Sequence, residues 1–263
     1  MLESQRHQML LEVLAKHQFM RVGDLTRALA ASEATVRRDI NKLSAQHQLV
    51  KIRGGAQSLE NAGPGTVKKQ LNSEPFSSSA EQNRAAKVAI AQRAVAMCND
   101  GDSIIINGGS STFMMGQFLR DRSLNIMTNS FVLATELAAN TDNQITLPGG
   151  ELYREQGIIL SAFDDDTIQH YSAKIMFMGS PAINERGVME SDPLLIRSEQ
   201  KLRRQAEKLV VLADSSKLGA HSHLLFCQLS DVDVVITNEG ADEDMLTTLR
   251  RHGVEVIITT LTT

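Results

Sequence analysis

Residues 32–56 read SEATVRRDINKLSAQHQLVKIRGGA, and this stretch decides the fold of the first part of the chain. Val36, Ile40 and Leu43 recur at helical spacing and predict the buried stripe of a helix. Ser32 stands just before it and is expected to cap the helix by accepting a hydrogen bond from the free amide near Thr35. The opposite side of the predicted helix collects the polar residues Arg38, Asn41 and Lys42 with Ala34, flanked by Thr35 and Arg37.

The neighbouring patterns complete a recognisable module. Two short helical patterns precede the stretch, formed by Met9, Leu10, Val13 and Leu14 and then by Val22, Leu25 and Leu29. After it, residues 49–52 alternate like a strand, and Arg53-Gly54-Gly55 predicts a tight basic turn. This order is typical of a winged helix-turn-helix, whose second helix enters the major groove of DNA.

The residue types on the outer face suit DNA. Arginine pairs with guanine, asparagine with adenine, and lysine or threonine with phosphate. Lys51 and Arg53 in the wing suit phosphate or minor-groove contact. Asp39 lies on the flank, where we expect it to pair with an arginine rather than read a base. The alternative is a three-helix bundle with a solvated basic face, and the wing at the expected place favours DNA binding.

Charge and composition divide the chain into a basic head and an acidic body. The net charge of the whole chain is −4. Residues 1–56 nevertheless carry nine Lys and Arg against five Asp and Glu, a net of +4. The remainder carries a net of −8. With 263 residues, the chain suits two domains. It has no apolar run of about 20 residues, and its start lacks a signal-peptide segment. Cys98 and Cys227 lie far apart and predict reduced core thiols. We therefore expect a cytoplasmic protein.

The first domain resembles the DeoR family of bacterial repressors. The residues that carry the resemblance are Ser32-Glu33-Ala34-Thr35-Val36-Arg37-Arg38-Asp39-Ile40, then Leu43, then Lys51 to Ala56. They follow the family pattern S-x-x-T-[IV]-R-R-D-[LI], with a hairpin that ends G-G-A. The resemblance implies operator binding by the helix that begins at Glu33. The residues expected to contact DNA are Ser32, Glu33, Thr35, Arg37, Arg38, Asn41, Lys42, Lys51 and Arg53.

The rest of the chain predicts a linker and an α/β body. We place the winged helix-turn-helix at residues 1–58, a linker rich in Ser, Asn, Gly and Pro at 59–79, and an effector and oligomerisation domain at 80–263. In this last part helical and strand patterns alternate, which predicts a largely parallel sheet. The predicted strands are 103–106, 124–127, 144–147, 173–178, 208–213, 232–237 and 254–258, and the predicted helices are 85–96, 112–119, 131–139, 192–207 and 242–251.

Small polar loops follow four of the predicted strands, at the edge where ligands of such sheets bind. They are Asn107-Gly108-Gly109-Ser110-Ser111-Thr112, Thr128-Asn129-Ser130, Gly149-Gly150 and Asp214-Ser215-Ser216-Lys217. Glycines let backbone amides approach an anion, hydroxyls add donors, and the start of a helix adds positive potential. Lys217 would supply a point charge for a phosphate. The alternatives are ordinary tight turns and a solvated lysine.

The body resembles the DeoR effector domain, which is itself similar to phosphosugar isomerases. The resemblance implies a phosphorylated sugar or sugar-acid effector, surrounded by Asn107, Gly108, Gly109, Ser110, Ser111, Thr112, Thr128, Asn129, Gly149, Gly150, Asp214 and Lys217. Asn107 stands where the family commonly has Asp, and Ser110 and Ser111 stand where it has threonines. Residues 198–202 and 224–226 look closest to the ascorbate-utilisation branch of the family, which suggests a sugar-acid phosphate. We expect a repressor of a carbohydrate-utilisation operon, a dimer or tetramer that uses no cofactor.

An enzyme is the rival class, because a sugar-phosphate isomerase also needs such a pocket. Isomerisation requires a general base at the substrate. Residues 178–183 offer no titratable side chain, although Glu185, Glu190 and Asp192 follow closely. We also expect the helix that carries Glu199-Gln200-Lys201 to lie at the effector or at a neighbouring subunit. His221-x-His223 lacks an evident third metal ligand, and the eleven scattered methionines suit a core.

Overall fold

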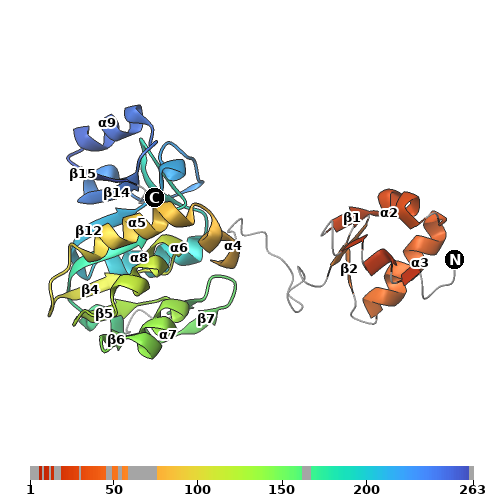
Figure 1. Cartoon of the computed structure of the whole chain (residues 1–263), viewed down its shortest axis with the longest axis horizontal. Helices are drawn as coiled ribbons and strands as arrows, with labels where there is room; N and C mark the ends of the chain where they lie inside the picture. The colour runs from red at the N-terminus through yellow and green to blue at the C-terminus, as the bar shows by residue number, and fades with distance from the viewer. Residues whose placement is uncertain are drawn as a thin grey trace. The chain divides into compact units, whose positions relative to one another are not determined.

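The chain divides into two compact units, residues 1–70 and 71–263, which are described separately (Figure 1). The computed structural model describes residues 6–7, 9–11, 13–14, 19–29, 31–45, 49–52, 55–58, 76–161 and 167–260. Within these ranges, no helix is long and apolar enough to cross a membrane.

The first unit is a small helical domain with a three-stranded sheet. Helix α2 (Val22–Leu29) is followed by α3 (Glu33–Ala45), and the antiparallel strands β1 (Phe19–Arg21), β3 (Gly55–Ser58) and β2 (Leu49–Ile52) pair in that order. The buried apolar residues are Leu10, Leu14, Val22, Leu25, Leu29, Val36, Ile40, Leu43, Leu49 and Ala56. The predicted buried stripe of α3 is therefore confirmed, as is the pattern of α2. The described residues among 6–14 are helical, with Leu10 and Leu14 buried and Met9 exposed.

The sheet of the first unit differs from the prediction in two ways. Strand β1 was not expected, because three residues are too few to show an alternating pattern. Gly55 belongs to β3 rather than to the turn: a Cβ there would lie 2.2 Å from the Met20 carbonyl oxygen, so only glycine lets β1 and β3 approach. Arg53 and Gly54 lie outside the described residues.

The second unit is built on a seven-stranded parallel sheet in the order β15-β14-β12-β9-β4-β5-β6. Short apolar runs form its strands because a parallel sheet is covered on both faces. The strands are β4 (Ser103–Ile106), β5 (Asn125–Thr128), β6 (Gln144–Thr146), β9 (Ala173–Gly179), β12 (Ala206–Leu212), β14 (Val234–Asn238) and β15 (Glu255–Thr259). The α/β architecture expected from the sequence is confirmed.

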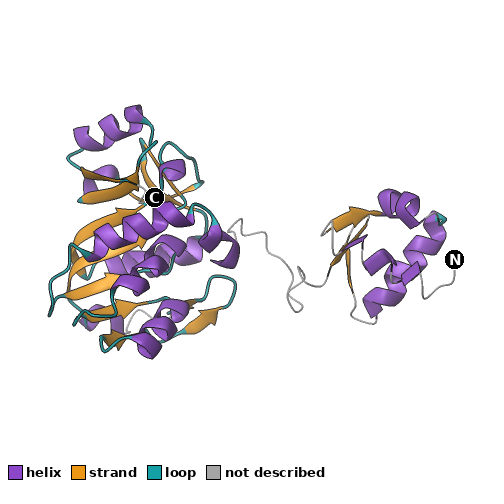
Figure 2. Ribbon diagram, viewed as in Figure 1, coloured by secondary structure: helices purple, strands orange, loops and turns teal. Residues whose placement is uncertain are grey.

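Helices cover both faces of this sheet (Figure 2). One core cluster joins Ile105 and Met176 of the sheet to residues of α8 (Pro193–Arg203) and α9 (Glu243–Arg251). The other joins Ile104 and Phe177 to residues of α5 (Arg84–Val95) and α7 (Phe131–Asn140). Successive strand residues thus face opposite layers. Methionines such as Met176 lie in these cores, as the scattered methionines predicted.

Several local predictions about the second unit were wrong. The predicted helix 112–119 is a single turn, α6 (Ser110–Phe113), continued by a 3₁₀ helix at Met114–Phe118. The predicted helix 192–207 ends at Arg203, because β12 begins at Ala206. The antiparallel strands β10 (Ala182–Asn184), β11 (Gly187–Glu190) and β13 (Leu224–Cys227) form a small sheet that was not expected, and neither was the hairpin of β7 (Glu151–Tyr153) and β8 (Ile158–Leu160).

The predicted linker, residues 59–79, extends too far toward the C-terminus. Helix α4 (Phe76–Glu81) begins inside the range 59–79, and its serine-rich sequence hid it. Ser79 contacts the body, since its Oγ lies 3.0 Å from the Oγ of Ser110 and its carbonyl accepts a 2.5 Å hydrogen bond from Nζ of Lys87. Gln57 and Ser58 belong to β3. Residues 59–75 lie outside the described part of the chain.

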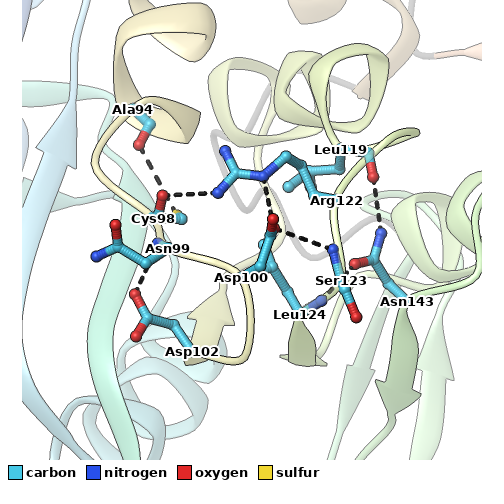
Figure 3. Close-up of polar contacts among 10 residues, drawn as sticks. All are labelled: Ala94, Cys98, Asn99, Asp100, Asp102, Leu119, Arg122, Ser123, Leu124 and Asn143. Carbon is cyan, nitrogen blue, oxygen red and sulfur yellow. Dashed lines mark hydrogen bonds and ion pairs between the residues drawn. The ribbon is translucent and has the colours of Figure 1, made fainter.

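Polar contacts tie together the edge of the sheet where its strands begin (Figure 3). Arg122 donates to Asp100 over 2.8 Å and to the carbonyl of Cys98 over 2.7 Å. Asn143 accepts from the amide of Leu124 and donates to a carbonyl, each over 2.8 Å. The hydrogen bond from Arg122 lowers the pKa of Asp100. Burial raises the pKa of the Cys98 thiol to about 11, so it stays protonated, as expected of a core thiol.

Candidate functional sites

The start of α3 is fixed by its capping residue. The amide of Thr35 donates to Oγ of Ser32 over 3.3 Å, and the two hydroxyls lie 2.8 Å apart. The predicted N-cap is confirmed. Ser32 and Thr35 were both expected to contact DNA, and their hydroxyls are already engaged with each other at the helix start.

The outer face of α3 is exposed, as its polar residues predicted. Arg37, Arg38, Asn41 and Lys42 are exposed there. Arg37 pairs with Glu33, four residues earlier, over 2.6 Å, and both side chains remain about 60% exposed. Arg38 and Asn41 make no hydrogen bond to another described side chain. The face therefore presents donors to a partner outside the chain.

Asp39 lies on the inner flank of α3 and is 3% exposed. Its carboxylate accepts a 2.5 Å bond from Nε of Arg6 and lies 3.1 Å from a ring nitrogen of His7. Burial alone would raise the pKa of Asp39, but the hydrogen bonds from Arg6 and His7 outweigh it and hold the pKa below its usual value. The prediction that this aspartate pairs with an arginine is confirmed.

The wing of the predicted module is only partly described. Lys51 belongs to β2, but nothing is described of its side chain, and Arg53 lies outside the described residues. Their expected phosphate contacts stay predictions.

The second unit holds a cavity of about 450 Å³ at the edge of the sheet where the strands end. This is the size of a small-molecule site, and it lies where parallel sheets bind ligands. Most of its lining residues are polar, and they come from many elements: Ser79, Lys87, Gly108, Gly109, Ser110, Ser111, Gln156, Ile158, Gly179, Ser180, Pro181, Glu190, Ser191, Leu195, Glu199, Lys217, His221, Ser222 and His223.

The loop after β4 contributes four of its six predicted residues to this wall, Gly108 to Ser111. Asn107 and Thr112 lie behind them and are buried. The hydroxyl of Thr112 donates to the carbonyl of Asn107 over 2.9 Å. Because α6 is one turn long, it adds less positive potential than the longer predicted helix would have supplied.

The loop after β5 supports the first loop rather than forming the wall. Oδ1 of Asn129 accepts from the amide of Gly108 over 2.8 Å, and Oγ1 of Thr128 accepts from the amide of Ser130 over 3.0 Å. Both predicted residues are buried, at 1% and 0% exposure. The Gly108 amide is thus already paired within the chain, so Asn129 fixes the position of the loop after β4.

Of the other two predicted loops, only the one after β12 contributes a residue to the cavity wall. Gly149 and Gly150 are exposed and do not belong to the cavity wall. Gly150 has φ +150°, and a Cβ there would meet the Leu160 carbonyl oxygen at 2.2 Å, so it serves the β7–β8 hairpin. Asp214 is buried and caps a short 3₁₀ helix by accepting from the amide of Ser216 over 3.2 Å. Lys217 does belong to the wall.

A buried lysine in the cavity wall was not among the predicted site residues. Lys87 of α5 lines the cavity and is 2% exposed. The signal was present, because Lys87 shares the stripe of Ile90, Ala91 and Ala94 at helical spacing. His221 and His223 also line the cavity, a place that their spacing as possible metal ligands did not predict. In the described ranges, no group of three or more His, Cys, Asp and Glu side chains could hold a metal ion.

Two buried glutamates stand in the same wall. Glu190 ends β11 and is 6% exposed, and Glu199 of α8 is 2% exposed. Oε1 of Glu190 accepts from the amide of Ser191 over 2.6 Å, and Oε1 of Glu199 accepts from Nδ2 of Asn107 over 2.7 Å. Burial raises the pKa of Glu190, and burial together with the charge of Glu190 raises the pKa of Glu199 well above its usual value.

A helix-turn-helix with an exposed basic helix, carried by an α/β body with a ligand-sized cavity, defines a DNA-binding transcriptional regulator with a sensor domain. Residues 6–62 match the DeoR-like helix-turn-helix domain, and residues 82–239 match the DeoR C terminal sensor domain. The chain belongs to the DeoR family.

Relatives support the same assignment over the whole chain. The chain is 35% identical over 257 residues to the HTH-type transcriptional regulator UlaR of Shigella dysenteriae serotype 1 (strain Sd197), which covers 98% of this chain and 99% of that protein. It is 34% identical, with the same coverage, to UlaR of Escherichia coli (strain K12 / DH10B).

Solved structures are more distant. Ribose 5-phosphate isomerase A of Methanocaldococcus jannaschii has a TM-score of 0.39 at 19% identity, covering 52% of this chain and 55% of that one. eIF2B beta from Chaetomium thermophilum has a TM-score of 0.43 at 17% identity, covering 64% of this chain and 54% of that one. The chain spans about half the length of these structures.

Proposed function

We propose that this regulator is a repressor of a carbohydrate-utilisation operon, and that a phosphorylated sugar or sugar acid releases it from its operator. The observation that carries the proposal is the cavity wall, where the hydroxyls of Ser110 and Ser111 lie with Lys87 and Lys217. Hydroxyl and ammonium donors are the groups that hold a phosphate. A cavity of about 450 Å³ suits a phosphorylated sugar.

The predicted effector residues take two roles in this proposal. Gly108, Gly109, Ser110, Ser111 and Lys217 would contact the phosphorylated ligand. Asn107, Thr112, Thr128, Asn129 and Asp214 would hold the contacting residues in place, because each is buried and hydrogen-bonded behind them. Gly149 and Gly150 are not part of this proposal, since they lie outside the wall.

The DNA side of the proposal rests on α3. Arg38 and Asn41 would read bases, and Thr35, Arg37 and Lys42 would contact phosphates or flanking bases. Ser32 and Glu33 would fix the helix start and the position of Arg37. Lys51 and Arg53 would contact the backbone from the wing. A dimer or tetramer in the cytoplasm would supply the paired heads that specific affinity requires.

The identity of the phosphorylated effector is the most specific part of the proposal. Residues 198–202 and 224–226 look closest to the ascorbate-utilisation branch of the family, and the likeness to UlaR agrees with that resemblance. A sugar-acid phosphate therefore belongs among the first ligands to test.

The test begins with operator selection from randomised duplex DNA by the full-length protein. The bound complex is then titrated with ribose 5-phosphate, glucose 6-phosphate and gluconate 6-phosphate, and release is followed by mobility shift and binding by thermal unfolding. We expect one of these phosphorylated classes to release DNA and to raise the unfolding temperature. If no phosphorylated compound did either, the sensor proposal would be wrong. Light scattering of the same sample reports the oligomer.

An isomerase is the second candidate, since Glu190 and Glu199 bring carboxyl groups to the cavity wall. The family and the relatives favour a regulator, so we propose binding without turnover. Incubating the protein with pentose and hexose phosphates tests this: conversion above background would overturn it.

A further inference from the structure

Glu199 has one carboxyl oxygen that the folded chain leaves unused. Its Oε1 accepts the bond from Asn107, whereas its Oε2 is buried and has no hydrogen-bond partner among the described residues. A buried polar atom without a partner destabilises the folded state, and such atoms are rare in native structures. Since Glu199 lines the cavity, a ligand there can provide the missing partner.

The charges around Glu199 disfavour its ionised form. Glu190 at the end of β11 and Asp192 at the start of α8 are buried carboxyls near it, and both disfavour a further negative charge. The other titratable groups that face it or share the cavity are the Cys227 thiol of β13, Lys87, Lys217, His221 and His223. Strand β8 carries no charged side chain, and His170 of the neighbouring 3₁₀ helix and Glu207 and Lys208 of β12 are exposed. No described cation bonds to Glu199, so its surroundings favour the protonated form of the carboxyl.

We propose that Glu199 is a ligand-recognition residue: its protonated carboxyl donates the Oε2 hydrogen to an uncharged acceptor oxygen in the sugar part of the effector. This inference rests on the proposed function of the cavity. The acceptor is a hydroxyl or carbonyl oxygen rather than a carboxylate, because a ligand carboxylate would meet the negative charge of Glu190. A carboxylic acid kept neutral by its surroundings is a known hydrogen-bond donor in binding sites.

The same geometry links binding to pH. Asn107, which holds Glu199, directly precedes the Gly108–Ser111 loop, so a phosphate at that loop would be a second anion near the acid. The anionic ligand favours the protonated form of Glu199. When the pH rises above the pKa of Glu199, binding requires uptake of a proton, and affinity falls by up to about tenfold per pH unit.

The experiment compares two variants of Glu199 in the full-length protein. Glu199→Gln keeps the acceptor for Asn107 and replaces the acid by an amide donor that does not titrate. Glu199→Leu removes both hydrogen-bonding groups. Glu207→Gln is the matched control, because it neutralises an exposed glutamate outside the cavity wall. Since the chain has no tryptophan, affinities are measured by calorimetry, with inorganic phosphate, ribose 5-phosphate, glucose 6-phosphate and gluconate 6-phosphate as probes. The range is pH 7 to 9.5, where sugar phosphates, as monoesters with a second pKa of about 6, are largely dianionic.

We expect Glu199→Gln to bind the sugar phosphates within about twofold of wild type at pH 7 and to lose the alkaline fall in affinity. Glu199→Leu should lose at least about tenfold for the sugar phosphates, the loss of one good hydrogen bond. It should keep inorganic phosphate within about twofold. Proton uptake, obtained by repeating the titration in buffers of different ionisation enthalpy, should disappear in Glu199→Gln.

Two results would overturn the inference. A Glu199→Gln protein as weak as Glu199→Leu would show that Glu199 accepts a hydrogen bond as a carboxylate. Wild-type affinity of Glu199→Leu for the sugar phosphates would show that it does not contact the ligand. If Glu199→Leu failed to fold, an unchanged pH profile in Glu199→Gln would be decisive against the inference. Failure of the proposed function looks different, since wild type itself would then bind none of the four probes.

Discussion

The two helices that carry the candidate recognition residues expose them in opposite ways. Helix α3 of the first unit presents Arg38 and Asn41 to solvent, whereas α8 of the second unit buries Glu199 against the end of the sheet. A surface that reads a polymer must be open along its length. A cavity that reads a small molecule must surround it and exclude water. The same helical periodicity therefore produces an exposed site in one unit and an enclosed site in the other.

The contrast extends to the charges that each helix tolerates. Glu33 and Arg37 form an exposed pair on α3, of the kind that contributes little to stability. Asp39 on the same helix is buried and depends on Arg6 and His7. On α8, Glu199 is buried without a bonded cation, and its surroundings raise its pKa and favour the protonated form. Burial thus decides whether an acidic residue needs a partner, a proton or neither.

The largest effect is expected where the exposed helix depends on a buried contact. Asp39→Ala removes the partner of Arg6 and His7, and breaking a buried ion pair costs about 3 kcal/mol. We expect hydrogen exchange of the α3 amides in the full-length protein to accelerate by about a hundredfold, with the body unchanged. The matched control, Glu33→Ala, breaks the exposed pair and should cost less than about 1 kcal/mol. Equal effects of the two variants would remove the distinction between buried and exposed acids.

The same contact predicts the response of the first unit to acid. Because the folded state lowers the pKa of Asp39, its contribution is fully present above the pKa of the unfolded carboxyl. That contribution disappears as the pH falls through the lower folded pKa. In Asp39→Ala, the stability of this unit should therefore fall less steeply as the pH is lowered through that range. A wild-type acid profile in that variant would contradict the assignment.

The next largest effect concerns the exposed face itself. Arg38→Ala removes a donor that no described residue uses, so it should leave stability unchanged. We expect specific operator binding to fall by about ten- to a hundredfold and to be lost in a retention assay, because a bidentate base contact contributes about 1–3 kcal/mol. Arg27→Ala, on the exposed side of α2 beside Asp24, is the control. Binding to unselected DNA should change much less; an equal loss on both DNAs would indicate a phosphate contact.

The sequence predicted the exposed site better than the enclosed one, for a physical reason. The outer face of α3 is one helix, so the spacing of Val36, Ile40 and Leu43 was enough to define its opposite side. The cavity wall combines α5, α8, β11 and the loop after β4, which meet only in the folded chain. The ends of the strands could be predicted from the sequence. Gly108 to Ser111 and Lys217 were therefore predicted as site residues, because they follow such ends.

Two signals for the enclosed site were nevertheless present in the sequence. Lys87 and Glu199 occupy buried stripes of their helices, where a charged residue needs an explanation. Gly149 and Gly150 misled in the other direction, because glycines that serve a hairpin look the same as glycines that admit a ligand. The β10-β11-β13 sheet, which brings Glu190 to the wall, depends on pairing between distant segments and leaves little local signal.

A smaller effect is expected at the cavity. Lys217 is half-buried in the wall, and no described carboxylate pairs with it. Lys217→Ala should weaken inorganic phosphate and sugar phosphates alike, by about fivefold to tenfold, because it removes a point charge rather than a sugar contact. Calorimetry on both probes measures this, with the exposed Lys208→Ala as control. A loss confined to the sugar phosphates would place Lys217 at the sugar instead.

The smallest effect is expected in the wing, and it separates positioning from reading within the first unit. If Lys51 contacts only phosphate, Lys51→Ala releases one fewer counterion on binding. The slope of log affinity against log salt should fall by about one, on the selected operator and on unselected DNA alike. Discrimination between the two DNAs should persist, in contrast to Arg38→Ala. Mobility shifts at several salt concentrations measure both quantities, and a loss of discrimination would mean that the wing also reads sequence.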